Sequence, residues 1–208
     1  RSVGRARARH PAIEWVAADL AGMRAAGDWK SLLDGCDVVV NCAGALQDGR
    51  VTLNSIFDCE RGSFYFGARR LRDHHPYGNL SVKKIITKSS NIGAAKIAIQ
   101  LKSARLHHYV KEFGFGDRTR VSLPGEVRGT VHPLKNWNKL SITRVPMGHE
   151  VAVTPMQMVM MLSAVANGGK LMRPMLLDSL RDESGRVMVQ YHSEAIRQVI
   201  PTQESTGK

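Results

Sequence analysis

The apolar positions of the first 50 residues form short runs. Residues 13–19 and 37–41 are two of them, and the second, DVVVN, is β-branched and uninterrupted. Such a run is typical of a strand buried on both faces of a parallel sheet. Between them, residues 28–33 begin with an Asp that can cap a short helix. A strand, helix, strand unit is therefore predicted, closed by a turn at residues 42–44.

After residue 50 the character of the chain changes, and several segments show the apolar spacing of helices. Three helices are predicted at residues 81–88, 92–101 and 103–113. Thr154 and Pro155 start a fourth over residues 156–166, because a capping hydroxyl is followed by proline at the first helical position. That segment is apolar almost all round, so we expect it to be buried.

The remaining segments of this second part are predicted from shorter signals. Residues 51–57 alternate as a strand, and residues 58–77 are expected to form a loop. A hairpin is predicted around a turn that ends at Gly185. Residues 193–199 are expected to form a last short helix.

The formal charge of +12 is concentrated in the second part of the chain. Residues 1–50 hold 7 Lys and Arg against 6 Asp and Glu, and the rest hold 23 against 12. Such an excess favours contact with polyanions such as acidic cell-wall polymers or lipid headgroups. A solubilising surface is the simpler interpretation, because the cations are scattered without interleaved aromatic residues, and no nucleic-acid partner is expected.

The three cysteines, Cys36, Cys42 and Cys59, show no metal-ligand spacing, so neither a metal nor a cofactor is expected. No apolar run is long enough for a membrane span or a signal core, and we therefore expect no anchor in this chain.

Ser89-Ser90-Asn91 lies between two predicted helices and is the motif of greatest chemical interest. Taken by itself it is a helix N-cap, because Ser and Asn satisfy the free N–H groups of a first turn. A bare S-x-N triplet is weak support for catalysis, and a chain of this length holds on the order of one by chance.

The first 50 residues resemble the nucleotide-binding half of short-chain dehydrogenase and epimerase-type proteins, through Ala18-Asp19-Leu20, DVVVN at residues 37–41 and the following Cys42-Ala-Gly44. This resemblance implies a partial Rossmann-like fold. The glycine-rich first turn that holds the dinucleotide in that family is absent, so an NAD(P)-binding remnant is an alternative interpretation and no bound cofactor is expected.

Several short phrases after residue 50 occur in one order: Lys88-Ser-Ser-Asn-Ile-Gly93, Phe113-Gly-Phe-Gly116, Leu123-Pro-Gly-Glu126, Val151-x-Val-Thr-Pro-Met-Gln157 and Ala166-Asn-Gly-Gly169. Together they resemble the class B penicillin-binding proteins, the D,D-transpeptidases that cross-link peptidoglycan. The resemblance covers residues 51–200. It implies an α/β (α+β) fold, mainly the helical subdomain of the transpeptidase, between the partial Rossmann-like unit at residues 1–50 and a tail at 201–208.

The resemblance also implies the chemistry. In that family S-x-x-K supplies the acyl-forming serine, while S-x-N and K-T-G complete the cleft. Ser89 corresponds to the serine that relays a proton, and Asn91 to the amide that binds the substrate's peptide carbonyl. We expect no S-x-x-K ahead of Ser89; the match at Ser205-Thr-Gly-Lys208 is in the wrong order, and K-T-G is absent. The chain is therefore expected to be an inactive, chimeric fragment.

The implied partners are the peptidoglycan stem peptide, β-lactams, and division or elongation proteins, at the periplasmic face of the bacterial inner membrane. A non-catalytic module that binds the cell wall or a division partner is the second interpretation. Arg120 is a local departure, because it stands where the family usually has Gly.

Overall fold

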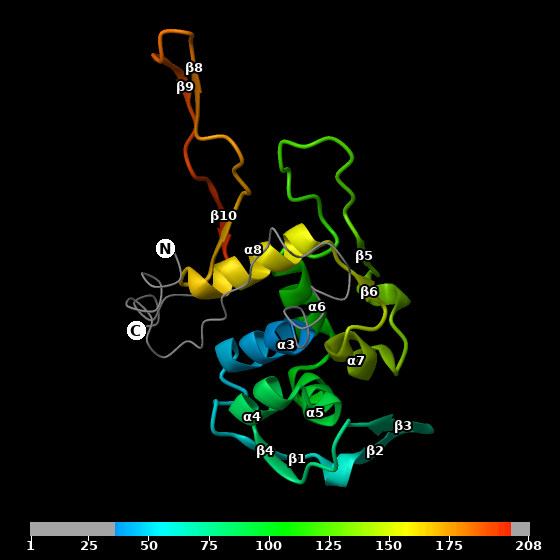
Figure 1. Ribbon diagram of the computed structural model, residues 1–208. Helices are drawn as coiled ribbons and strands as arrows, with labels where there is room; N and C mark the ends of the chain where they lie inside the picture. The colour runs from blue at the N-terminus through cyan, green and yellow to red at the C-terminus, as the bar shows by residue number, and fades with distance from the viewer. Residues whose placement is uncertain (1–35, 201–208) are drawn as a thin grey trace. The chain divides into compact units, whose positions relative to one another are not determined.

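A computed structural model describes residues 36–200 (Figure 1). The α-helices are α3 Cys36–Gln47, α4 Val82–Lys88, α5 Asn91–Leu101, α6 Ser103–Glu112, α7 Ser141–Arg144 and α8 Pro155–Ala166. The short 3₁₀ turns are η1 Glu60–Gly62, η2 Leu134–Asn136 and η3 Val145–Met147. The strands are β1 Ile56–Asp58, β2 Ser63–Phe66, β3 Arg69–Arg72, β4 Asn79–Ser81, β5 Thr130–Val131, β6 Val151–Ala152, β7 Lys170–Met172, β8 Ser179–Arg181, β9 Val187–Gln190 and β10 Ala195–Gln198.

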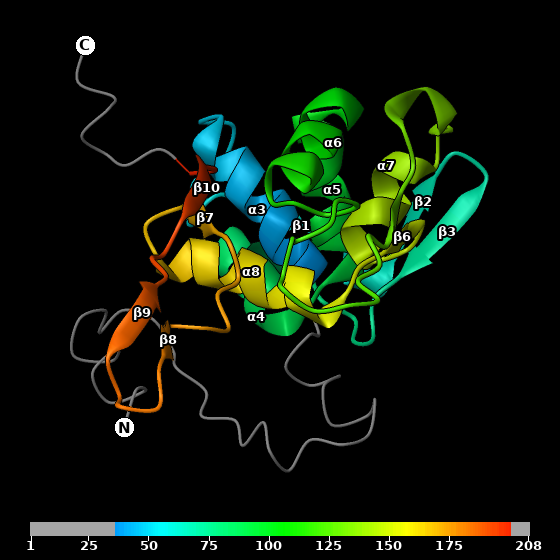
Figure 2. The same cartoon turned by 90° about the horizontal axis from the view of Figure 1, so that it is seen from above.

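The centre of the described part is helical. In Figures 1 and 2, α5 lies beside α3 and α7, and α3 also packs against α6. Most of α5 is buried, including Ile92, Ile97 and Leu101, which have no exposed surface. A helix that is apolar on nearly every side needs neighbours all around it, and this explains why α5 is the centre of the core.

Helix α3 overturns the strand predicted at residues 37–41, because the DVVVN run lies inside a 12-residue helix. The cause is visible at Gly44, which was expected in a turn. A Cβ at this position would lie 2.4 Å from the Tyr109 ring, so the glycine serves a close contact between α3 and α6. Packing of this kind readily overrides a local preference for strand. Residues 13–19 and 28–33 lie outside the described part of the chain.

Four of the helices predicted in the second part, those at residues 81–88, 92–101, 103–113 and 156–166, are confirmed. Ser81 caps α4, since its side chain accepts a hydrogen bond from the Lys84 N–H. Thr154 and Gln157 form a capping box at the start of α8, each side chain accepting a hydrogen bond from the other's backbone N–H. These helices follow the sequence closely because their caps are local signals.

The apolar composition of α8 predicts burial on every side, but the structure leaves one of its faces exposed. Met158, Met160 and Met161 are buried, whereas Val159, Leu162 and Val165 are 50, 39 and 39% exposed. These last three positions are three residues apart and therefore form one apolar stripe along the helix.

The described strands pair two by two, always antiparallel: β1 with β4, β2 with β3, β5 with β6, β7 with β10, and β8 with β9. The strand predicted over residues 51–57 is limited to β1, and the loop predicted at 58–77 contains the β2–β3 hairpin. The helix predicted at 193–199 is instead β10, because this segment pairs with β7. The β8–β9 hairpin is confirmed, and it extends away from the helices in Figure 1.

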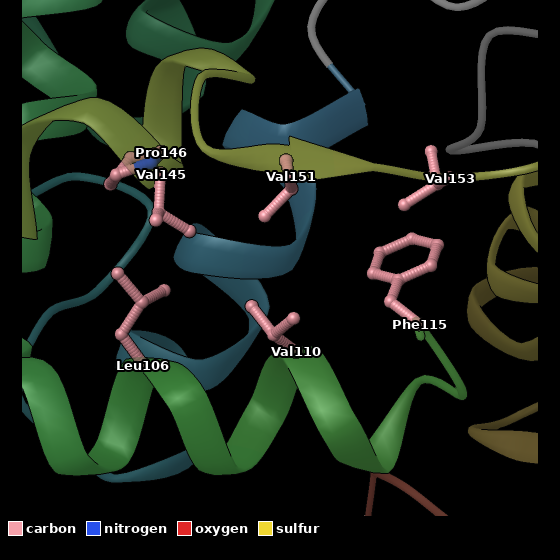
Figure 3. Close-up of a pocket in the computed structure, with 7 residues that line it drawn as sticks. All are labelled: Leu106, Val110, Phe115, Val145, Pro146, Val151 and Val153. Atoms are coloured by element: carbon pink, nitrogen blue, oxygen red, sulfur yellow. The ribbon is translucent and has the colours of Figure 1, made fainter. Parts of the chain in front are cut away.

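An apolar seam joins α6 to the η3 and β6 segments (Figure 3). Its lining consists only of Leu106, Val110, Phe115, Val145, Pro146, Val151 and Val153. The open space there is about 10 Å³, which is the lower limit for one water molecule, and no polar side chain faces it. The seam is therefore core packing and is no candidate for ligand binding.

Candidate functional site

The S-x-N triplet forms the link between α4 and α5, and its first residue has an unusual backbone. Ser89 has φ 52° and ψ 44°, the left-handed region, and its N–H bonds the last turn of α4. This conformation costs an L-residue roughly 1–2 kcal/mol and persists only where surrounding contacts impose it. The half-exposed Ser89 hydroxyl makes no hydrogen bond with any other described residue.

Ser90 supplies those contacts. Its side chain has no exposed surface and caps α5, with its Oγ 3.0 Å from the Gly93 N–H that it accepts. The same hydroxyl donates to Asp73 Oδ2 at 2.7 Å, and Asp73 Oδ1 accepts the Ile92 N–H at 2.9 Å. Ser90 and Asp73 therefore hold the first turn of α5 from two directions.

Asn91 follows at the first position of α5 and is half-exposed. Its Nδ2 donates to the carbonyl of Arg72, 3.1 Å away, at the end of β3. A primary amide carries two N–H donors, so one remains for another acceptor. The β2–β3 hairpin thus fixes the direction of the Asn91 amide without using all of its capacity.

A buried thiol lies behind this turn. Cys59 Sγ is 3.4 Å from Ser90 Oγ, and burial raises the pKa of the thiol, with Asp73 adding to the effect and the bond from Ser90 opposing it. A thiol kept neutral is a poor nucleophile. Cys59 therefore contributes packing to the site, and no chemical role follows from it.

One residue of this framework, Asp73, does not follow from the sequence. Asp73 precedes the triplet by 16 residues and lies in the segment predicted as a loop, so no local pattern connects it with Ser90. The Ser90 cap was part of the simple N-cap interpretation, which the structure confirms. The signal available for Asp73 was a single carboxylate directly after an arginine-rich segment, and this pattern alone has no structural meaning.

The expectation that no S-x-x-K pair precedes Ser89 is wrong as a statement about the sequence, because Ser81-Val-Lys-Lys84 fits that spacing. The structure gives this pair another role. Ser81 Oγ accepts the Lys84 N–H at 3.2 Å, and the exposed Lys84 side chain makes no hydrogen bond to that hydroxyl. Nucleophile activation requires a base within reach of the hydroxyl, and the pair lacks this contact. Ser205 and Lys208 lie outside the described residues.

Within residues 36–200, no group of three or more His, Cys, Asp or Glu is arranged to hold a metal ion. None of the helices in this range is long and apolar enough to cross a membrane.

Comparisons with known proteins agree with this geometry. The family described as penicillin binding protein transpeptidase domain matches residues 39–208, which is most of the chain. The chain belongs to the penicillin-binding protein transpeptidase family. Penicillin-binding protein PbpB of Mycolicibacterium smegmatis is 30% identical over 165 residues, 78% of this chain and 25% of that protein.

Two further relatives support the same assignment. Peptidoglycan D,D-transpeptidase FtsI of Escherichia coli is 28% identical over 131 residues, 63% of this chain and 22% of that protein. The transpeptidase domain of Burkholderia pseudomallei penicillin-binding protein 3 superimposes with a TM-score of 0.65 at 30% identity, covering 67% of this chain and 42% of that structure. The chain spans about a quarter of the length of the curated relatives PbpB and FtsI.

The family match bears on the N-terminal prediction. It begins at residue 39, inside the DVVVN run that carried part of the resemblance to short-chain dehydrogenases. Since this run belongs to helix α3, which packs on transpeptidase helices, the dehydrogenase-like interpretation is not supported. The compact unit that holds the site begins at Gly35.

Proposed function

We propose that this chain is part of a peptidoglycan D,D-transpeptidase of the class B type, and that it provides the S-x-N corner of a penicillin-binding cleft. In this proposal, residues 36–200 form one partial transpeptidase domain, so that α3 is added to the region predicted at 51–200. The substrate is the peptidoglycan stem peptide, and β-lactams are competing ligands.

The proposal rests on the unused hydrogen-bonding groups of Ser89 and Asn91, the two outer residues of the triplet. Ser90 is fully used by the fold, whereas the Ser89 hydroxyl and one Asn91 N–H are left without partners among the described residues. Buried polar groups are normally satisfied, and half-exposed groups held by a strained turn are suited to bind a ligand. Ser89 then relays a proton and Asn91 donates to a substrate carbonyl.

Both of these roles support a nucleophile rather than replace one. Acyl transfer needs a serine whose hydroxyl is deprotonated by an adjacent base, and neither Ser89 nor Asn91 has such a base at hydrogen-bond distance. The sequence has no K-T-G. We therefore expect the chain by itself to form no acyl-enzyme.

Labelling with a fluorescent penicillin tests this expectation. The purified full chain is incubated with the reagent and separated on a denaturing gel beside Ser81→Ala and Ser205→Ala variants. We expect no covalent label. A label that disappears in either variant identifies a working nucleophile in this chain and overturns the expectation of inactivity.

A non-catalytic binding module is the second candidate, favoured by the concentration of positive charge after residue 50. Retention on isolated peptidoglycan separates the two roles of the triplet. If the wild type is retained and Ser89→Ala with Asn91→Ala is not, binding occurs at the S-x-N corner. Unchanged retention in the double variant assigns binding to the charged surface instead.

The proposed location is the periplasmic face of the bacterial inner membrane, where the stem peptide is found, with division or elongation proteins as partners. Cross-linking in living cells followed by identification of the captured proteins tests this part. Recovery of cytoplasmic proteins alone contradicts it.

A further inference from the structure

A second pocket lies away from the S-x-N corner, where the loop after α6 meets the start of α8 and the β7–β10 pair. Its volume is about 330 Å³, which is in the range of small-molecule sites. The pocket differs from the apolar seam of Figure 3 in size and in chemistry. Phe113, Met160 and Leu171 are buried and line it, so part of its wall is apolar.

Arginines dominate the polar part of the wall. Arg118, Arg120, Arg173 and Arg197 line the pocket together with only two carboxylates, Asp117 and Glu194. Both carboxylates are already paired. Asp117 bonds Lys111 at 2.8 Å, and Glu194 bonds Arg173 at 3.1 Å.

Of the four guanidinium groups, those of Arg118 and Arg120 have no ion-pair partner among the described residues. Arg173 and Arg197 have acidic partners, the latter in Glu112 at 3.5 Å. The side chains of Arg118 and Arg120 make no hydrogen bond or ion pair with any described residue. Glu126 is the remaining carboxylate nearby, and its oxygens accept the Thr119 hydroxyl and the Thr119 and Arg120 N–H groups. The bond from the Thr119 hydroxyl lowers the pKa of this carboxyl, and the Arg118 charge adds to the effect without forming an ion pair.

The buried side-chain amide of Gln157 also lines the pocket, but its hydrogen bonds are already made within the protein. Gln157 Nε2 donates to the carbonyls of Asp117 and Arg128 at 2.7 and 2.9 Å, and its Oε1 accepts the Thr154 N–H at 2.9 Å. Among the arginines that line the pocket, Arg118 and Arg120 are therefore the two whose guanidinium groups make no direct bond within the described residues.

Arg120 also adopts a backbone conformation that is unfavourable for any residue with a Cβ atom. Its φ of 60° lies in the left-handed region, where glycine is accommodated without strain. Replacement by glycine thus removes the guanidinium and relieves the backbone at once, which makes this position informative for a binding test.

We propose that this pocket binds a small organic anion in which a carboxylate or a phosphate ester is attached to an apolar body. The planar guanidinium fork matches both anions through paired hydrogen bonds, and the apolar part of the wall accommodates the body. The pocket shares no lining residue with the Ser89-Ser90-Asn91 triplet, and the proposal does not depend on transpeptidase activity.

The test uses phenyl phosphate and phenylacetate as probes and phenethyl alcohol as the neutral control, titrated into the full chain. Binding is followed by the backbone amide shifts of residues 113–120 and 194–198. We expect both anions, but not the alcohol, to shift these amides, and added salt to weaken binding because it screens exposed charge. The stronger of the two probes identifies which anion the pocket takes.

Variants supply the decisive comparison. Arg118→Gln combined with Arg120→Gly is expected to weaken anion binding by about tenfold or more, since two charge-assisted contacts are lost. Arg181→Gln combined with Arg186→Gln removes the same two charges from the β8–β9 hairpin and is expected to leave binding unchanged. Equal shifts with the alcohol, unchanged affinity in the double variant, or no shift with either anion overturns the proposal.

Discussion

At the residue scale, the most consequential side chain is Ser90, the central member of the triplet. It stands at the variable position of S-x-N, yet it is the residue whose side chain the fold uses completely. A buried hydroxyl that caps a helix and also donates to a carboxylate is difficult to replace, because its removal leaves both partners unsatisfied.

Replacing Ser90 with Ala is expected to lower the free energy of unfolding by about 1–3 kcal/mol. The matched control is Ser81→Ala, which removes a half-exposed cap from the seven-residue helix α4 and is expected to lose about 0.5–1 kcal/mol. Urea denaturation of both variants gives the comparison. Equal losses would show that the bond to Asp73 adds nothing.

Asp48 is one of four described carboxylates whose pKa is lowered in the folded chain. Its bond from Arg105 lowers the pKa of the carboxyl, against the raising effect of burial, and Tyr109 and Arg50 add to the lowering. The Tyr109 hydroxyl donates to Asp48 Oδ1 at 2.7 Å, and its pKa is raised to about 12 by burial and by this bond, so it stays protonated.

Because the folded pKa of Asp48 is lowered, its contribution is complete above the unfolded value of about 3.9 and is lost as pH falls through the folded pKa. We expect Asp48→Asn to lose about 1–3 kcal/mol at neutral pH, and this deficit to shrink below about pH 4. Denaturation across that range measures it, with the exposed Glu183→Gln as control. A deficit that stays constant with pH contradicts the assignment to the Asp48 charge.

At the element scale, the position of α5 against α4 depends on the absence of one side chain. A Cβ on Gly93 would lie 2.5–2.9 Å from three side-chain carbons of Ile85. The two helices approach so closely there that even a methyl group forces a shift.

Gly93→Ala is therefore expected to destabilise the fold by about 1–3 kcal/mol through overpacking. Combining it with Ile85→Ala removes the clash, so the double variant should lose less than the sum of the two single variants. Gly78→Ala is the control, since a Cβ there meets nothing within 4 Å. Additive losses in thermal denaturation contradict a direct contact.

Whether the sequence predicts an element correctly depends on how far along the chain its stabilising contacts lie. Helices with local caps, such as α4 and α8, were predicted with nearly correct limits because Ser81 and Thr154 act within one turn. Helix α3 and strand β10 were assigned to the wrong class, since Gly44 and the pairing with β7 depend on residues more than 20 positions away. The S-x-N residues were located, but their support from Asp73 was not.

At the scale of the whole described unit, large apolar side chains remain exposed in several places. Two of these places are the α8 stripe and the β8–β9 hairpin, where Met188 is 59% exposed. Patches of this kind promote association, whereas the net charge of +12 keeps copies apart. Salt screens the charge but not the apolar contact, and the balance therefore depends on ionic strength.

We expect the chain to self-associate more as salt is raised, and Val159→Gln with Leu162→Gln to reduce this association. Sedimentation velocity at several protein concentrations measures it. Ser163→Gln, at an exposed polar position of the same helix, serves as control. If the double variant sediments as the wild type does at every salt concentration, the stripe is not the contact.

The close contact between Gly44 and Tyr109 offers a spectroscopic consequence. Aromatic rings alter the local magnetic field, and the glycine backbone lies against this ring with no side chain between them. The Gly44 α-protons should therefore resonate well away from ordinary glycine positions in a proton spectrum. They would return to those positions when α3 separates from α6, so a single resolved signal can report whether these two helices are docked.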